Sequence, residues 1–287
     1  MDLWNINDIR YLLKKYKFDY SHSLGQNFLI DQHVCPKIVE MSNISKNTGV
    51  IEIGPGIGVL TVEIARAAKK VVAIEIDKRL LPILNETLTD YDNIKIINQD
   101  ILKTDLKEII KTEFDNRDIV VCANLPYYIT SSIIMYLLTS NLKIKSITVM
   151  VQKEVAERIT ATPGSREAGV LSLAVRYYSE PKILFDVSKN SFNPRPKVDS
   201  SVINLSVRTS KLVSVKSEKL FFKVIKAAFS KRRKTVINSL SSVLTIDKPI
   251  LNDIFNKIDI DPNKRAENLS LENFRDIANS LFDMNMN

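Results

Sequence analysis

The sequence predicts an α/β fold in which a seven-stranded sheet is followed by a small all-α domain. Up to residue 151, short apolar runs with strand-like periodicity alternate with amphipathic helical stretches, and two more strands joined by a proline-bearing loop follow. Such alternation is typical of a parallel sheet with right-handed crossovers, and only the helical pattern continues after the last strand. The expected strands are residues 50–53, 71–76, 94–97, 119–123, 146–151, 182–187 and 201–207.

The helical segments set the expected domain boundary. The N-terminal arm is helical in pattern, and residues 33–42 are expected to form the helix that leads into the first strand. Beyond the polar stretch at 208–214, helical periodicity covers residues 217–242, 248–256 and 270–283. We therefore expect a catalytic domain over residues 1–210, with an arm at 1–30, and a helical domain over residues 211–287.

Composition limits the function classes. The chain of 287 residues is 45% hydrophobic, enough to bury a full core, and its net charge of +8 favours a polyanionic partner. Cys35 and Cys122 are far apart in the sequence, and neither they nor His22 and His33 form a metal-ligand pattern, so no metal site is expected. No apolar run approaches the ~18 residues of a membrane span. The N-terminus lacks the apolar core of a signal peptide, and a cytoplasmic protein is expected.

A nucleotide-type site is predicted where the first strand meets a glycine turn. Gly-Pro-Gly-Ile-Gly, which begins at Gly54, lies between strand and helix patterns, and the second strand carries Glu75 about 20 residues on, where such sites place an acid for ribose hydroxyls. A dinucleotide site would need a third glycine where Val59 stands. Asp100 follows the third strand, placed to accept from an adenine amine. Singly, both acids fit ordinary strand ends. Together the four elements predict a Rossmann-like domain that binds S-adenosyl-L-methionine, which has ribose and adenine but no phosphates.

Asn-Leu-Pro-Tyr follows the strand at 119–123 and suits a flat exocyclic amine such as adenine N6. The side-chain oxygen of Asn124 can accept one N–H group. Pro126 favours an extended Leu125, whose carbonyl can accept the other, and Tyr127 offers a ring for stacking. An ordinary strand exit with a proline turn fits the tetrapeptide equally well.

The chain resembles the bacterial small-subunit ribosomal RNA adenine dimethyltransferases over nearly its whole length. Besides the two motifs above, the matching segments are Ser-Leu-Gly-Gln-Asn-Phe-Leu at 23–29, Val-Gln-Lys-Glu-Val-Ala-Glu-Arg at 151–158, Ser-Phe-Asn-Pro-Arg-Pro-Lys-Val-Asp-Ser at 191–200, Ala-Phe-Ser-Lys-Arg-Arg-Lys-Thr at 228–235 and Arg-Ala-Glu-Asn-Leu at 265–269. The resemblance implies two methyl groups on each of two adjacent adenosines near the 3′ end of the RNA. It also implies a monomeric enzyme that acts in a partly assembled small subunit and has a role in its biogenesis.

The resemblance also assigns roles to residues. Asn27 and Leu29 close over the methionine end of the cofactor, and Gly54 lies against it. Glu75 binds its ribose, Asp100 its adenine, and Asn124 contacts both cofactor and target amine. Phe192 is the implied second aromatic that, with Tyr127, sandwiches a flipped base; without the resemblance, Phe192 fits an ordinary core side chain.

Two groups of basic residues are predicted to contact RNA, although charge runs more often form solvated helix faces. The first is the run Lys231, Arg232, Arg233 and Lys234, and the second is Arg195 and Lys197, which flank Phe192. Two other functions stay open. One is a large-subunit RNA adenine methyltransferase that confers macrolide resistance, and the other is a non-catalytic ribosome assembly factor.

Overall fold

The computed structural model describes residues 2–21, 24–115, 117–231 and 233–285, and the chain divides into two compact units. The first unit comprises Met1–Ala156 and Glu180–Val207, and the second comprises Glu157–Ser179 and Arg208–Asn287. Residues 157–179 thus group with the C-terminal helices. No helix in the described ranges combines the length and the apolar character needed to cross a membrane.

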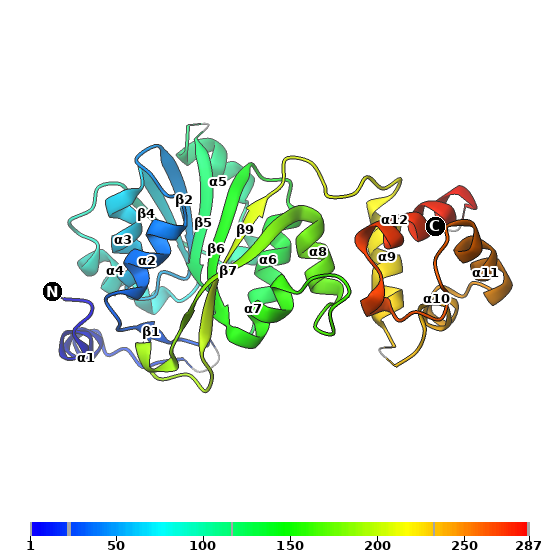
Figure 1. The fold of residues 1–287 in the computed structure, drawn as a ribbon. Helices are drawn as coiled ribbons and strands as arrows, with labels where there is room; N and C mark the ends of the chain where they lie inside the picture. The colour runs from blue at the N-terminus through cyan, green and yellow to red at the C-terminus, as the bar shows by residue number, and fades with distance from the viewer. Residues whose placement is uncertain (1, 22–23, 116, 232, 286–287) are drawn as a thin grey trace. The chain divides into compact units, whose positions relative to one another are not determined.

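A seven-stranded sheet forms the centre of the first unit (Figure 1). Its strands, in spatial order, are β4 (Ile94–Asn98), β3 (Lys70–Glu75), β2 (Thr48–Ile53), β5 (Asp118–Asn124), β6 (Ile144–Gln152), β9 (Ser200–Val207) and β7 (Ser179–Val187). Every residue of β2 is buried, as expected for a central strand covered on both faces, whereas β4 at the edge is partly exposed. The seven predicted strands are confirmed.

The parallel sheet predicted for the five strands from 50–53 to 146–151 is confirmed, and one further strand runs in the opposite direction. Strands β2 to β6 pair in parallel, but β9 pairs antiparallel with β6, with Ile147 opposite Leu205. Parallel neighbours need a long crossover connection, usually a helix. No α-helix lies between β7 and β9, so the chain returns into the sheet without such a crossover.

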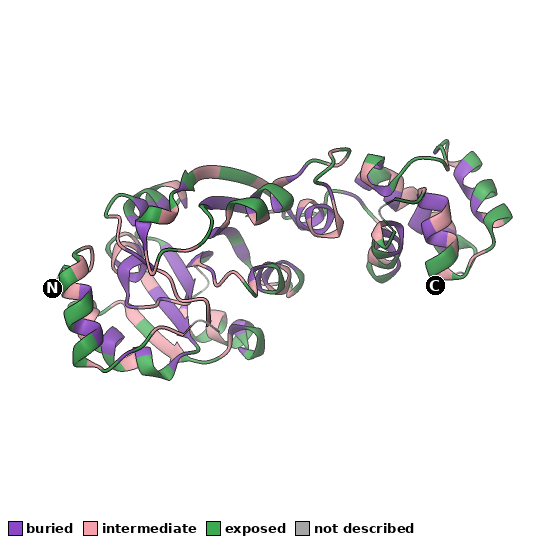
Figure 2. Ribbon diagram, turned by 90° about the horizontal axis from the view of Figure 1, so that it is seen from below, coloured by how far each residue is buried: buried purple, intermediate pink, exposed green. Residues whose placement is uncertain are grey.

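Helices cover both faces of this sheet (Figure 1). Figure 2 shows their outer surfaces largely exposed while the strands are mostly buried. The helices of the first unit are α1 (Ile6–Lys15), α2 (Val34–Met41), α3 (Val59–Ala67), α4 (Leu81–Thr87), α5 (Leu106–Glu113) and α6 (Thr130–Thr139); α7 (Lys153–Thr160) spans the boundary of the two units. The predicted helix at 33–42 corresponds to α2.

A short ribbon that the sequence did not predict joins the N-terminal arm to the loop after β7. Strand β1 (Phe28–Leu29) pairs antiparallel with β8 (Phe192–Asn193), and the Ile30 backbone N–H extends the pairing by donating to the Ser191 carbonyl at 2.9 Å. The arm therefore has a defined path along the first unit. Two segments from the resemblance, 23–29 and 191–200, meet here.

The second unit is helical apart from the start of β7. Its helices are α8 (Val170–Tyr178), α9 (Glu218–Phe229), α10 (Val236–Leu244), α11 (Lys248–Lys257) and α12 (Leu271–Asp283). Phe221, Phe255 and Phe274 are fully buried in its core. The single helix expected over 217–242 is wrong, because α9 ends at Phe229 and α10 begins only at Val236. Like charges in consecutive turns of a helix repel, which disfavours helix through the basic run.

Candidate active site

A pocket lies at the carboxyl edge of the sheet in the first unit, where ligand sites of α/β sheets are expected. About 1040 Å³ of empty space belongs to it, counted with the solvent at its open mouth. The structure brings eight predicted site residues to its wall: Asn27, Leu29, Gly54, Glu75, Asp100, Asn124, Leu125 and Tyr127. They come from the arm and from the ends of β2, β3, β4 and β5, which the parallel pairing places side by side.

The glycine turn leaves room for a ligand against its backbone. Gly54, Gly56 and Gly58 all have positive φ angles, of 69°, 62° and 94°, which side chains rarely adopt. A Cβ atom added at Gly54 would meet nothing within 4 Å, so the space in front of this residue is open. At Gly56 an added Cβ would lie 3.1 Å from the Phe28 ring, which shows that the arm packs on the turn. The open space at Gly54 fits the cofactor predicted from the sequence.

Glu75 presents a buried carboxylate at the end of β3. Its side chain accepts hydrogen bonds from the backbone N–H groups of Asp77, at 2.8 Å, and Gly56, at 3.4 Å. Burial raises the pKa of Glu75 to about 7, and these backbone bonds partly offset the rise. A carboxylate fastened in this way can accept hydrogen bonds from ribose hydroxyls, as its position in the sequence predicted.

Asp100 begins the 3₁₀ turn Ile101–Lys103, with its Oδ1 accepting from the Leu102 backbone N–H at 3.0 Å. This bond fixes the carboxylate at the end of β4, beside the pocket. The second carboxylate oxygen lies 4.0 Å from Lys103 Nζ, too far for a hydrogen bond. Asp100 thus keeps acceptor capacity for an adenine amine.

Asn124 is the last residue of β5, and Leu125 follows it. Asn124 Nδ2 donates to the Asn27 backbone carbonyl at 3.3 Å, and the Leu125 backbone N–H donates to the Met150 carbonyl at 3.1 Å. The Tyr127 hydroxyl bonds to Ser200 Oγ at 2.9 Å, which holds one end of its ring. Asn124, Leu125 and the Tyr127 ring therefore all line the pocket.

Phe192 does not line this pocket. It is paired with Leu29 in the β1–β8 ribbon, and its side chain is only 3% exposed, within the hydrophobic core of the first unit. The pocket wall has instead Tyr128, which is 60% exposed and to which the sequence analysis gave no role. The stacking role of Phe192 stays a prediction.

Glu52 is a pocket residue that the sequence analysis missed. It lies on β2 two positions before the glycine turn and is 1% exposed. Burial raises its pKa to about 8, and the nearby Thr61 hydroxyl lowers it in part. Glu52 Oε2 and Thr61 Oγ1 are both buried, and neither has a hydrogen-bond partner within the described part of the chain. The sequence offered one signal for this residue: it is an acid inside an otherwise apolar strand pattern.

The predicted RNA-binding residues are exposed, apart from Arg232, which lies outside the described residues. Arg195 and Lys197 lie in the loop between β8 and β9. Lys231, Arg233 and Lys234 lie between α9 and α10, in a turn and not on a helix face as expected. We call these three residues the basic turn. In the described part of the chain, no group of three or more His, Cys, Asp or Glu residues could hold a metal.

Residues 17–283 match the family described as "Ribosomal RNA adenine dimethylase". The chain belongs to this family. It is similar to proteins named "Ribosomal RNA small subunit methyltransferase A": 49% identical over 271 residues to that of Alkaliphilus oremlandii and 50% over 274 residues to that of Bacillus pumilus, with 94% of each chain covered in both cases.

Solved structures agree with the family. A dimethyladenosine transferase from Plasmodium falciparum is 28% identical, with a TM-score of 0.76 over 90% of this chain and 97% of the other. The 23S rRNA methyltransferase ErmE is 25% identical, with a TM-score of 0.69 over 88% and 98%. Three sequence predictions are thereby confirmed: the methyltransferase fold with a helical C-terminal part, an rRNA adenine dimethyltransferase as enzyme class, and S-adenosyl-L-methionine as methyl donor.

Proposed function

We propose that this chain dimethylates N6 of two adjacent adenosines near the 3′ end of small-subunit ribosomal RNA. One observation carries the proposal: the two acceptors at Asn124 and Leu125 share a single pocket with the Gly54 turn and the Glu75 carboxylate. The pocket thus combines groups suited to an adenine amine with groups suited to a nucleoside cofactor. S-adenosyl-L-methionine, when bound, supplies the electrophilic sulfonium methyl group.

Positioning carries most of the proposed chemistry. The N6 lone pair is delocalised into the adenine ring, so the amine is a poor nucleophile. Asn124 Oδ1 and the Leu125 carbonyl accept its two N–H groups and turn its lone pair towards the methyl group. Both acceptors are neutral dipoles that stabilise the positive charge developing on N6. The tetrapeptide contains no histidine, lysine or carboxylate to act as a general base, and the proton leaves to water after transfer.

The pocket supports separate roles for the other residues. Gly54, Asn27 and Leu29 hold the methionine end of the cofactor, while Glu75 and Asp100 hold its ribose and adenine. Tyr127 stacks on the target base. Because Phe192 is buried, its ring contributes to a base sandwich only if the β1–β8 ribbon shifts when RNA enters.

The small subunit is the favoured substrate. Proteins named for small-subunit methylation share about half of their residues with this chain over 94% of both lengths, whereas the large-subunit enzyme is 25% identical. We propose a monomer that acts in the cytoplasm on partly assembled subunits. Its exposed basic residues, Arg195, Lys197 and those of the basic turn, contact phosphates.

Transfer of labelled methyl groups tests this function. Small subunits that lack the modification, and large-subunit RNA, are incubated separately with the protein and labelled S-adenosyl-L-methionine. We expect label only in the small subunit, as dimethyladenosine at two adjacent positions. Label in the large-subunit RNA alone would favour the macrolide-resistance activity, and binding to small subunits without any transfer would favour a non-catalytic assembly factor.

A further inference from the structure

The orientation of the Asn124 side chain is set by the N-terminal arm. Its amide nitrogen donates to the Asn27 carbonyl at 3.3 Å, and among the described residues its Oδ1 has no hydrogen-bond partner. Turned by 180°, the amide would lose this bond and present a donor to the N–H groups of the target amine. An asparagine can serve as an acceptor there only while its nitrogen is engaged elsewhere. The Asn27 carbonyl is thus part of what makes Asn124 an acceptor.

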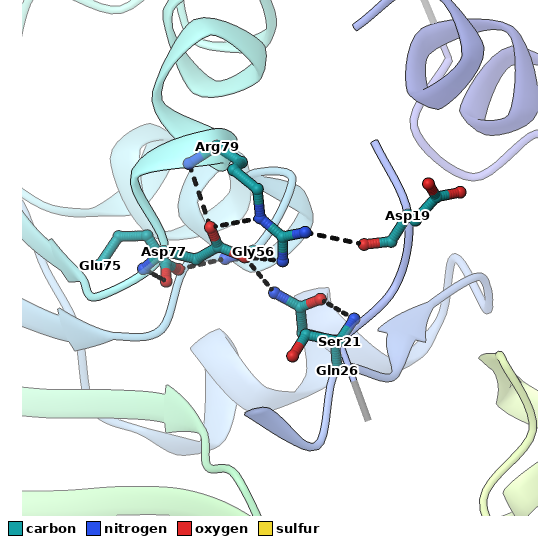
Figure 3. Close-up of polar contacts among 7 residues, drawn as sticks. All are labelled: Asp19, Ser21, Gln26, Gly56, Glu75, Asp77 and Arg79. Atoms are coloured by element: carbon teal, nitrogen blue, oxygen red, sulfur yellow. Dashed lines mark hydrogen bonds and ion pairs between the residues drawn. The ribbon is translucent and has the colours of Figure 1, made fainter. Parts of the chain in front are cut away.

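Two neighbouring residues fix the Asn27 carbonyl. On one side, Phe28 pairs with Asn193 in the β1–β8 ribbon. On the other, Gln26 Nε2 donates to Asp77 Oδ2 at 2.9 Å, and Gln26 Oε1 accepts from the Ser21 backbone N–H at 2.8 Å (Figure 3). The Gln26 side chain therefore fastens the arm to the loop after β3.

Asp77 is a firm anchor for this link. The Arg79 guanidinium bonds both of its carboxylate oxygens, at 2.9 and 2.6 Å (Figure 3). The same guanidinium lies over the Phe18 ring at 4.9 Å. The Arg79 side chain, followed by Gln26, keeps the pKa of Asp77 below its usual value despite burial, so Asp77 stays ionised at neutral pH. Its backbone N–H donates to Glu75 Oε1 at 2.8 Å, which joins the link to the ribose-binding carboxylate.

The arm meets the Asn-Leu-Pro-Tyr loop at a second point. Gly25 has a φ of +62°, and a Cβ atom there would lie 3.7 Å from the Tyr128 ring and 3.9 Å from the Tyr127 nitrogen. Asn27 Nδ2 closes this turn by donating to the Gly25 carbonyl at 3.0 Å. Residues 25–27 thus contact the loop directly on either side of the Gln26 link.

We propose that Gln26 and Asp77 are positioning residues that act through the Asn27 carbonyl to keep Asn124 Oδ1 directed at the target amine. Asp77 does not line the pocket; Gln26 does, but both polar atoms of its side chain are engaged by Asp77 and by the Ser21 backbone N–H. The inference rests on the proposed function, because it gives Asn124 the acceptor role. It also implies that the ribose side and the amine side of the pocket are mechanically linked through one stretch of the arm.

A double-mutant cycle tests the link. Gln26→Glu places a second carboxylate against Asp77, and Gln26→Ala removes the contact. Asp77→Asn is made alone and combined with Gln26→Glu. The double variant reverses the donor–acceptor pair and keeps the net charge of the network, while giving up one Arg79 hydrogen bond. With cofactor and small subunits saturating, we expect each Gln26 single variant to lose roughly tenfold in single-turnover rate, since small misplacements in a site slow chemistry strongly. The double variant should recover most of that loss.

Two measurements other than rate distinguish a positioning role from a general loss of structure. The side-chain NH₂ signal of Asn124, identified by its loss in Asn124→Asp, should move in Gln26→Glu and return in the double variant. Affinity for S-adenosylhomocysteine should change less than about threefold, because Glu75 and the Gly54 turn stay in place. Lys15→Ala is the matched control. It removes the ion pair of the arm with Glu86 but leaves residues 25–27 fastened, so rate and signal should stay unchanged.

Three results would overturn the inference: wild-type rates in both Gln26 variants, an unmoved Asn124 signal, or a double variant no faster than Gln26→Glu. A wild-type protein that transfers no methyl group to small subunits would contradict the proposed function instead. In that case the Asn124 signal still decides whether the link orients the side chain.

Discussion

The pocket and the basic turn use charge in opposite ways. In the pocket, Glu52 and Glu75 are at most 4% exposed, and burial raises the pKa of both. In the basic turn, Lys231, Arg233 and Lys234 are exposed. Buried charges are costly and need fixed partners, which suits a preorganised site, whereas exposed charges bind a polyanion with little geometric demand. The difference teaches that chemistry and RNA affinity should be separable by mutation.

The largest effect is expected from Asn124→Ala. The variant should bind S-adenosyl-L-methionine nearly normally yet lose on the order of 10²–10³ in turnover, as when one preorganised polar group is removed from an active site. Single-turnover methyl transfer measures the loss. Asn124→Asp, which keeps an acceptor oxygen, should retain part of the activity. A near wild-type rate in the alanine variant would remove Asn124 from the chemistry.

The buried state of Glu52 can be tested through the pH dependence of protein stability. The pKa of the Glu52 carboxyl is 4.5 in the unfolded chain and about 8 in the folded protein. Between these two pH values the folded state therefore holds one proton more than the unfolded state. The contribution of this proton to the free energy of unfolding is complete below pH 4.5 and is lost as the pH rises through about 8. Each pKa unit corresponds to about 1.4 kcal/mol, so the free energy of unfolding should fall by a few kcal/mol.

Glu52→Gln removes the titrating group and serves as its own comparison. Denaturant unfolding across the same pH range should give a flatter profile than that of the wild type, with the variant relatively more stable at pH 8 than at pH 5. Parallel profiles for the two proteins would show that Glu52 ionises normally.

Glu75→Ala should weaken S-adenosyl-L-methionine binding by roughly 1–3 kcal/mol, the usual loss when a buried charged acceptor is removed. Calorimetry measures this, and NADH should not bind to either protein. Glu63→Ala, which removes an acid that pairs with Arg66 on α3 and does not line the pocket, is a control with an expected change near zero in cofactor affinity. Unchanged affinity in Glu75→Ala would contradict the ribose assignment.

The smallest effect is expected at the basic turn. Replacing Lys231, Arg232, Arg233 and Lys234 with glutamine should weaken binding to small subunits, and each lost phosphate contact should lower the slope of log K against log salt by a little under one unit. Replacing four other exposed lysines of the second unit with glutamine removes the same charge and controls for it: Lys219, Lys226, Lys248 and Lys257. An unchanged slope in the basic-turn variant would identify a solvated surface and shift the search to Arg195 and Lys197.

The sequence predicted the parts of the site that strand ends and glycines mark. Gly54, Glu75, Asp100 and Asn124 follow apolar runs whose parallel pairing brings them to one edge of the sheet, and the structure places all four on the pocket wall. Family resemblance added Asn27 and Leu29, which also line it.

Other features could not be predicted because they depend on distant contacts. A two-residue strand such as β1 has no periodicity to detect, and its partner lies more than 160 residues away. The link from Gln26 to Asp77 joins two polar residues that look like ordinary loop residues in the sequence. The antiparallel insertion of β9 leaves its residue pattern unchanged, because alternation does not report strand direction.

The central claim is that chemistry and RNA affinity depend on separate residues. Measuring two variants in two assays tests it most directly. Asn124→Ala and the glutamine variant of the basic turn are each measured for small-subunit affinity and for single-turnover rate at saturating subunit. We predict that Asn124→Ala loses rate and keeps affinity, while the basic-turn variant loses affinity and keeps rate. Loss of both properties to the same extent in both variants would contradict the account.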